Sequence, residues 1–164
     1  MSQDLPCVTT TRIDLSALPS IPVGWTLAKH QQVFAEVDVR LRDDILLIDG
    51  CSVSIQQAPR QTDSLDGLAG RAIRKWALCN SPLNGTLCEY LGSKPSLVPR
   101  AWMRAGYILF WATMYRDPLR AARIPMLYRP RGSEPGTWKV GYALYHPIYR
   151  FDSKYVSALL GERV

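Results

Sequence analysis

The sequence predicts a single α+β domain with a mainly antiparallel sheet packed against two or three helices. The chain has 164 residues, of which 47% are apolar and 21% charged, a composition typical of one globular domain that buries a core without metals or disulfides. Several short runs alternate apolar and polar residues, as half-buried strands do. Two stretches with helical periodicity lie between these runs. Strands followed by helices and then by further strands are typical of α+β folds.

Residues 1–28 are predicted to form an extended N-terminal arm, and residues 29–164 the globular core. The arm contains Pro19, Ile21, Pro22 and Trp25. Prolines at this density remove backbone donors and favour extended chain, so the arm should lie against another surface. We expect Trp25 to pack onto the core.

Two strands should follow the arm. Residues 33–41 alternate in polarity and predict a half-buried strand, and Asp43-Asp44 predicts a turn. Residues 45–55 predict a second strand that is interrupted by Asp49-Gly50. The two strands are expected to form a hairpin.

The next part of the chain predicts helices. Residues 64–79 carry an apolar stripe at helical spacing, and Arg71, Arg74 and Lys75 lie off this stripe. A second, shorter helix should begin at Ser81-Pro82 and end at Gly92. Leu97 and Val98 follow in a proline-flanked loop, where they are either core residues or an exposed apolar tip.

The second half of the chain predicts two more strands and a helix. Residues 102–115 are rich in aromatic and β-branched residues, and 107–113 should form a central strand. Residues 116–131 combine arginines with apolar residues and prolines, which predicts an irregular basic segment. Residues 138–145 alternate as a strand, and a short last helix, capped by Asp152 or Ser153, should run to Gly161.

Charge is divided unevenly along the chain. Residues 1–70 contain 5 Lys/Arg and 9 Asp/Glu, whereas residues 71–164 contain 15 and 5. A cluster of cations indicates an anionic partner, either nucleic acid or lipid headgroups. The cations predicted to bind this partner are Arg71, Arg74, Lys75, Arg116, Arg120, Arg123, Arg129 and Arg131. Ile124, Met126 and Leu127 are predicted to contact a membrane.

Catalytic and metal-binding motifs are missing from the sequence. The four cysteines form no Cys-x-x-Cys pair, and the chain has two histidines and no phosphate-binding or nucleophile-elbow motif. A Cys88–His146 pair assembled in space is a distant alternative. We therefore expect no metal, no cofactor and no enzymatic activity. Without a signal peptide or an apolar span, the protein is expected in the cytoplasm or nucleus, neither secreted nor transmembrane.

Several segments, in their order along the chain, resemble the core of rhabdovirus matrix proteins. They are the strand at 33–41, the helix ending near Trp76, residues 87–93, the 95–99 loop, residues 101–104 running into 108–112, and Asp117-Pro118-Leu119. The resemblance spans about residues 30–160 as an ordered pattern, without a diagnostic motif. A long lysine-rich tail and a Pro-Pro-x-Tyr motif are missing, as they would be in a short member like those of plant-infecting viruses.

This resemblance implies a structural protein of the virion that self-associates, binds the nucleocapsid and links it to the membrane during budding. Leu97 and Val98 match the family's exposed apolar loop, which implies self-association there, and the segment with Pro19, Ile21, Pro22 and Trp25 would dock on a neighbouring copy. The implied partners are a second copy of the chain, nucleocapsid or RNA, and an anionic membrane surface in the host cytoplasm or nucleus. The alternative hypothesis is a small, basic, soluble nucleic-acid-binding protein.

Overall fold

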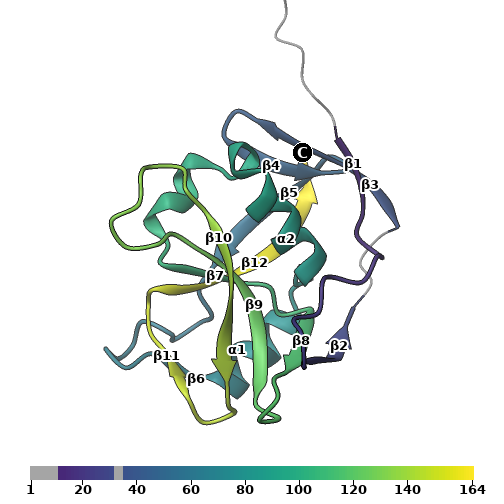
Figure 1. Ribbon diagram of the computed structural model, residues 1–164. Coiled ribbons are helices and arrows are strands. Elements are labelled where there is room, and N and C mark those ends of the chain that lie inside the picture. The colour runs from purple at the N-terminus through teal and green to yellow at the C-terminus, as the bar shows by residue number, and fades with distance from the viewer. Residues whose placement is uncertain (1–10, 32–34) are drawn as a thin grey trace, which may run out of the picture.

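The computed structural model describes residues 11–31 and 35–164, which form a ten-stranded sheet, a two-stranded sheet and two α-helices (Figure 1). The large sheet has the strand order β1-β3-β4-β5-β12-β7-β9-β8-β2, and β10 pairs with β9. Its strands are β1 Thr11–Asp14, β2 Thr26–His30, β3 Glu36–Arg42, β4 Ile45–Ile48, β5 Cys51–Gln56, β7 Tyr107–Leu109, β8 Thr113–Arg116, β9 Ala122–Tyr128, β10 Lys139–Tyr145 and β12 Tyr155–Arg163. Of the described pairs, only β12 with β7 is parallel. The α+β class and the mainly antiparallel sheet are confirmed.

Tight turns join β3 to β4 and β4 to β5. Asp43 and Asp44 have φ of 51° and 61°, and Asp49 and Gly50 have φ of 49° and 79°. Two consecutive left-handed residues match the right-handed twist of the flanking strands, and Asp and Gly tolerate this backbone better than most residues. The predicted hairpin is therefore confirmed, and its second strand is split in two at Asp49-Gly50.

The predicted arm is partly built into the sheet. Strand β1 pairs with β3, and β2, which begins at Thr26, pairs with β8. Between them the chain crosses the start of helix α2, Gly85–Ser93, where the Asn84 side-chain amide donates to Leu15 O (2.7 Å) and the Thr86 hydroxyl donates to Ala17 O (2.6 Å). Residues 11–28 are thus not a separate extended arm, because hydrogen bonds fix them to the core. Residues 1–10 lie outside the described part.

Helix α2, Gly85–Ser93, begins later than the sequence predicted. Ser81 has a φ of 53°, and the Leu83 N–H donates to Ala158 O, so residues 81–83 run beside β12 instead of opening the helix. Asn84 caps the helix, with its side-chain oxygen accepting from the Leu87 N–H (3.2 Å).

Helix α1, Gly70–Leu78, lacks the first turns that the sequence predicted from residue 64. Gly67 has a φ of 80°, and a Cβ at this position would overlap the Phe151 carbonyl. The short strand β6, Leu68–Ala69, pairs there with β11, Arg150–Phe151. Instead of a side-chain cap, the N–H groups of Gly70 and Arg71 donate to Tyr149 O (2.7 Å) and Pro147 O (3.0 Å). The helix therefore begins against the 146–149 turn.

Two further predictions were wrong because strand pairing overrides local sequence preference. The predicted last helix is strand β12, which lies between β5 and β7 in the centre of the sheet. The predicted irregular segment contains strand β9, which contacts β7, β8 and β10. Pro125, which has no N–H to donate, lies in β9 between the residues that pair with β8 and those that pair with β7.

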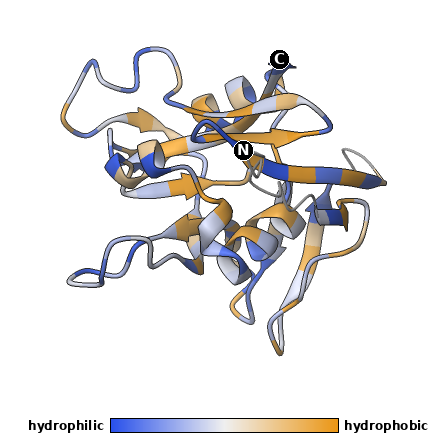
Figure 2. Ribbon diagram, turned by 90° about the horizontal axis from the view of Figure 1, so that it is seen from above, coloured by the Kyte–Doolittle hydropathy of each residue, from blue (hydrophilic) through white to orange (hydrophobic). Residues whose placement is uncertain are grey.

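The sheet has a core on each face. One core contains Leu87 and Leu91 of α2, with Ile108 and Leu127 from the sheet. The other contains Ile73 and Ala77 of α1, with Ile124 and Leu159. Figure 2 shows the hydrophobic residues concentrated on the helices and strands in the middle of the molecule. With both faces covered, the loops at the strand ends remain as places for polar and charged sites. Two of these loops, 117–121 and 146–149, lie at the lower end of the molecule in Figure 1.

Replacing Asn84 with alanine should lower the free energy of unfolding by about 2–4 kcal/mol, since the helix loses its cap and two carbonyl groups, one buried and one partly buried, lose a donor. These carbonyls belong to Leu15 and Gln31. Urea denaturation measures the change. Ser93→Ala, at the exposed end of the same helix, is the control and should be nearly neutral. Equal stability of Asn84→Ala and the wild-type protein would contradict the anchoring role.

Candidate functional site

A groove of about 530 Å³ lies where β8, β9 and β10 meet at one end of the molecule. The residues that line it are Met114, Arg116, Arg120, Ala121, Ala122, Leu144, Tyr145, His146, Pro147 and Tyr149. This lining contains two arginines, a histidine and two tyrosines, and no carboxylate. Arginines bind phosphate with planar, forked geometry, and aromatic rings present flat apolar faces beside them. The groove therefore suits an anionic ligand.

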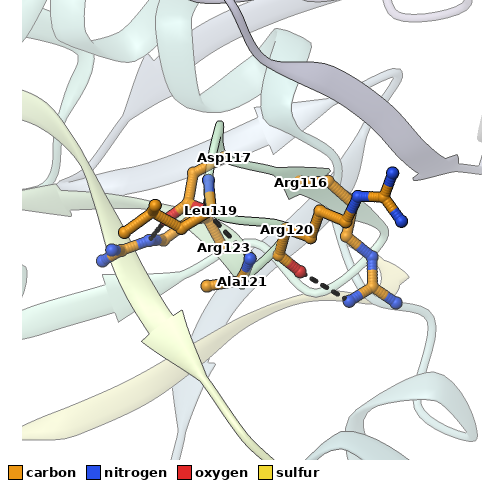
Figure 3. A network of polar contacts seen from close by, with 6 residues as sticks. All are labelled: Arg116, Asp117, Leu119, Arg120, Ala121 and Arg123. Atoms are coloured by element: carbon orange, nitrogen blue, oxygen red, sulfur yellow. Dashed lines mark hydrogen bonds and ion pairs between the residues drawn. The ribbon is translucent and has the colours of Figure 1, made fainter.

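One wall of the groove is the turn between β8 and β9, which is organised by Asp117 (Figure 3). The Asp117 carboxylate is nearly buried, and it accepts the N–H of Leu119 (3.0 Å), the N–H of Ala121 (2.9 Å) and the Nε–H of Arg123 (2.9 Å). An Asp-Pro pair followed by such bonds is a common way to fix a turn. The Asp117 carboxylate is therefore hydrogen-bonded within the turn.

These contacts also determine the protonation of Asp117. Desolvation alone would raise its pKa, but the hydrogen bonds from Ala121, Arg123 and Leu119, together with the charge of Arg123, hold the pKa below its ordinary value. Asp117 is therefore ionised at neutral pH, and its charge is neutralised by Arg123.

Arg116 and Arg120 are left free on the same side of this turn. Figure 3 shows both guanidinium groups pointing to one side, away from the Asp117–Arg123 pair. Arg116 donates from Nη1 to the backbone oxygen of Arg120 (3.1 Å), which holds the two residues together. Arg120 has a φ of 62°, so the backbone reverses at this residue. Both arginines are exposed.

The opposite wall is the turn that follows β10. The Tyr149 N–H donates to His146 O (3.0 Å), and the rings of the two residues lie 5.1 Å apart. Arg71 lies next to this turn, because its N–H donates to Pro147 O. Arg71 therefore adds a third exposed cation close to the groove.

The structure divides the predicted anion-binding residues into several groups. Arg116 and Arg120 share the groove, with Arg71 beside it and Lys75 one turn further along α1. Arg74 is half-buried, and its Nε has no partner among the described residues. Arg123 is occupied by Asp117. Arg129 and Arg131 follow the opposite end of β9, about 20 Å away at 3.3 Å per residue of strand.

Burial contradicts two of the three predicted membrane contacts. Ile124 and Leu127 are fully buried, in opposite cores of the sheet, and Met126 is half-buried. The prolines in this segment suggested an irregular surface loop, whereas the segment pairs on both edges as a central strand.

The predicted self-association residues are mostly buried against their own chain. Val98 lies in the core and Leu97 packs against it, so this loop is not an exposed apolar tip. Pro19 is buried. Trp25 packs on Tyr142, with ring centroids 4.9 Å apart, as predicted. Ile21 remains exposed, and Pro22 is half-buried.

A second cavity of about 630 Å³ lies beside the loop that contains Leu97 and Val98. It is lined by Leu41, Asp44, Pro95, Ser96, Val98, Arg100, Met103, Pro135, Gly136 and Trp138. The Asp44 carboxylate accepts hydrogen bonds from the backbone N–H groups of Arg100 and Ala101, and it therefore stabilises the chain that follows Pro99.

The Cys88–His146 pair is not assembled. Cys88 belongs to α2 and is fully buried in the core, whereas His146 is exposed in the groove wall. Burial and the nearby Glu89 charge raise the pKa of the Cys88 thiol, which disfavours the nucleophilic thiolate.

Sequence reasoning missed Leu119, His146 and Tyr149 as members of this end of the molecule. The available signals were turn motifs, Asp117-Pro118 and His146-Pro147, whose proximity depends on the pairing of β9 with β10. Sequence spacing alone does not reveal this pairing.

No protein-family model matches the chain, and no match was found among curated proteins or among solved structures. Within residues 11–31 and 35–164, no helix has the length and apolarity needed to cross a membrane. The same residues hold no group of three His, Cys, Asp or Glu side chains placed to bind a metal ion.

Replacing Asp117 with asparagine should lower the melting temperature at neutral pH by a few degrees, because Arg123 loses its charged acceptor. The pKa of Asp117 lies below 3.8, its ordinary value, so its stabilising effect is present above that pH and is lost as the pH falls through the folded-state pKa. The difference between variant and wild type should therefore shrink in acid. Thermal melts across a pH series measure this difference. Asp66→Asn, in an exposed loop, is the control, and a difference that does not change with pH would contradict the assignment.

Proposed function

We propose that this protein is a matrix-type structural protein that self-associates and attaches to an anionic partner through the Arg116–Arg120 groove. In this role the protein takes part in virion assembly by bridging the nucleocapsid and the membrane. It acts by binding and not by catalysis. It takes up the resemblance to rhabdovirus matrix proteins. The observation that carries it is a groove lined by two free arginines and no carboxylate.

The distribution of charge supports this proposal. Acidic residues of the first half lie largely on the β1–β3–β4 ribbon, where Arg12 pairs with Glu36 and Asp38. Among the described residues, the one ion pair that involves a cation of the second half is Asp117–Arg123. Within the part of the chain that the structure describes, the cations at the groove thus form no ion pairs with acidic residues of the first half of the chain. Their electrostatic field therefore acts on an external anion.

Ile21 supports self-association better than the other predicted residues. Its side chain is exposed, while the neighbouring Ser20 is fixed at both backbone groups, by Glu89 (N–H to Oε2, 3.0 Å) and by the Tyr115 hydroxyl (3.3 Å to its oxygen). An apolar side chain on a rigid segment loses little entropy on binding. The cavity lined by Trp138 and Met103 is a suitable acceptor on a second copy, because it is partly apolar and open.

A soluble nucleic-acid-binding protein is the second candidate, and the aromatic lining of the groove favours it. Tyr145, His146 and Tyr149 lie beside Arg116 and Arg120. Base stacking on aromatic rings combined with phosphate contacts is how many proteins bind single strands. In this case RNA is retained, but the protein does not assemble.

The double variant Arg116→Gln/Arg120→Gln should bind its anionic partner about tenfold to thirtyfold more weakly, at about 1 kcal/mol per cation. Retention of single-stranded RNA and of phosphatidylserine vesicles, each across a salt series, measures the loss. For RNA, the slope of log K against log salt should also fall by about one to two.

Arg131→Gln/Lys139→Gln is the matched control for this variant, since it removes two exposed charges at the other end of β9 and β10. It should retain nearly wild-type binding. Equal loss in both variants would show that net charge, and not the groove, attracts the partner. Wild-type protein that retains neither RNA nor vesicles at low salt would refute the proposed function.

Ile21→Ser should raise the concentration at which the protein assembles by about fivefold, because a partly exposed isoleucine no longer becomes buried between copies. Light scattering at rising protein concentration follows assembly. Leu65→Ser is the control, since Leu65 is also an exposed aliphatic residue but does not line the proposed acceptor cavity. A wild-type protein that stays monomeric, or equal effects of the two variants, would contradict self-association through this segment.

A further inference from the structure

Three apolar side chains project from turns around the arginine groove. Val23 is fully exposed, Leu119 is 89% exposed and Ile148 is 67% exposed. Single exposed apolar residues are common on protein surfaces, but neighbouring ones flanked by charge are typical of contact surfaces.

Strand pairing brings the three turns together. Thr26 of β2 pairs with Arg116 of β8, and a Cβ placed on Gly24 would lie 3.5 Å from the Pro118 side chain. The 22–25 turn with Val23 therefore lies against the 117–120 turn with Leu119. The 146–149 turn, which carries Ile148, forms the other wall of the same groove. Figure 1 shows the β8–β9 and β10–β11 connections side by side at the lower end of the molecule.

The backbone of each turn is well fixed. The Trp25 N–H donates to Pro22 O (3.0 Å), Asp117 holds the second turn, and the Tyr149 N–H closes the third. These side chains are therefore held outward by rigid turns, with Arg116 and Arg120 between them and Arg71 close by. Apolar tips with cations around them match the two layers of an anionic bilayer surface, its acyl boundary and its phosphates.

We propose that this end of the molecule is a membrane-contact surface. Val23, Leu119 and Ile148 enter the interface of an anionic bilayer, and Arg116 and Arg120 bind lipid headgroup phosphates in the groove. The proposal rests on the proposed function for its anionic partner and names lipid as that partner at this site. Aliphatic tips gain free energy by entering lipid, whereas RNA offers them no comparable apolar environment, so lipid is favoured over RNA.

This surface replaces the membrane contact predicted at Ile124, Met126 and Leu127. Those residues point into the two cores of the sheet. The turn that leads into their strand, however, carries Leu119 outward. The proposed surface therefore lies next to the predicted segment in the sequence but uses other side chains.

Flotation with two kinds of vesicle tests the proposal. One kind contains phosphatidylserine in phosphatidylcholine, and the other contains phosphatidylcholine alone. Wild-type protein should bind the first kind more tightly, with part of the binding surviving high salt. The double variant Leu119→Ser/Ile148→Ser should bind about tenfold or more weakly, and its remaining binding should disappear with salt, because only the arginines are left.

Leu65→Ser is the matched control, since Leu65 is 99% exposed but lies between Asp63 and Asp66. It should float like the wild-type protein. Thermal melts of all variants establish that these surface changes leave the fold intact.

The outcomes separate the membrane proposal from the proposed function. If Leu119→Ser/Ile148→Ser floats as well as wild type at every salt concentration, the membrane surface is refuted. If wild-type protein retains RNA through Arg116 and Arg120 but floats with neither kind of vesicle, the groove binds RNA, and the membrane surface is refuted while an anionic partner for the groove stands. If the protein retains neither RNA nor vesicles, both proposals fail.

Discussion

The turn between β8 and β9 depends on one nearly buried carboxylate. Asp117 must be desolvated to lie there, and this cost is offset because three donors, two of them backbone N–H groups, surround it. The same bonds direct Arg123 inward and leave Arg116 and Arg120 outside. A single acidic residue thus decides which of the three neighbouring arginines is internal and which two are available to a partner.

Local signals were sufficient for much of the fold. The Asp43-Asp44 and Asp49-Gly50 turns predict their own geometry, because few residues adopt left-handed backbone easily. Strand β10 alternates clearly enough to be recognised from sequence. Strand β12 was missed because Tyr155, Val156, Leu159 and Leu160 also fit a helix, and only pairing with β5 and β7 decides between the two. Helix α1 was predicted too long, since nothing local shows that Gly67 packs against Phe151.

For the candidate site, the sequence predicted only that cations are in excess in the second half of the chain. Counting charges along the chain correctly indicated unpaired cations in the second half. The count did not reveal that β9 separates Arg116 and Arg120 from Arg129 and Arg131, because it sums the charges of a segment without regard to their positions in space. Pro125 was read as a sign of irregular chain, although a proline fits a central strand where the neighbouring strands change. Membrane contact was accordingly placed on buried residues.

The division of charge has a consequence for how the molecule meets a surface. The acidic ribbon neutralises part of its own charge through Arg12 and lies at the upper end of the molecule in Figure 1, with the groove turns at the lower end. Exposed charges are screened beyond about 8 Å at physiological salt, so the acidic ribbon does not cancel the field at the groove. An anionic surface would then attract the groove end, where Arg116 and Arg120 line a groove without carboxylates. Binding through the groove end would leave the cavity beside Trp138 uncovered.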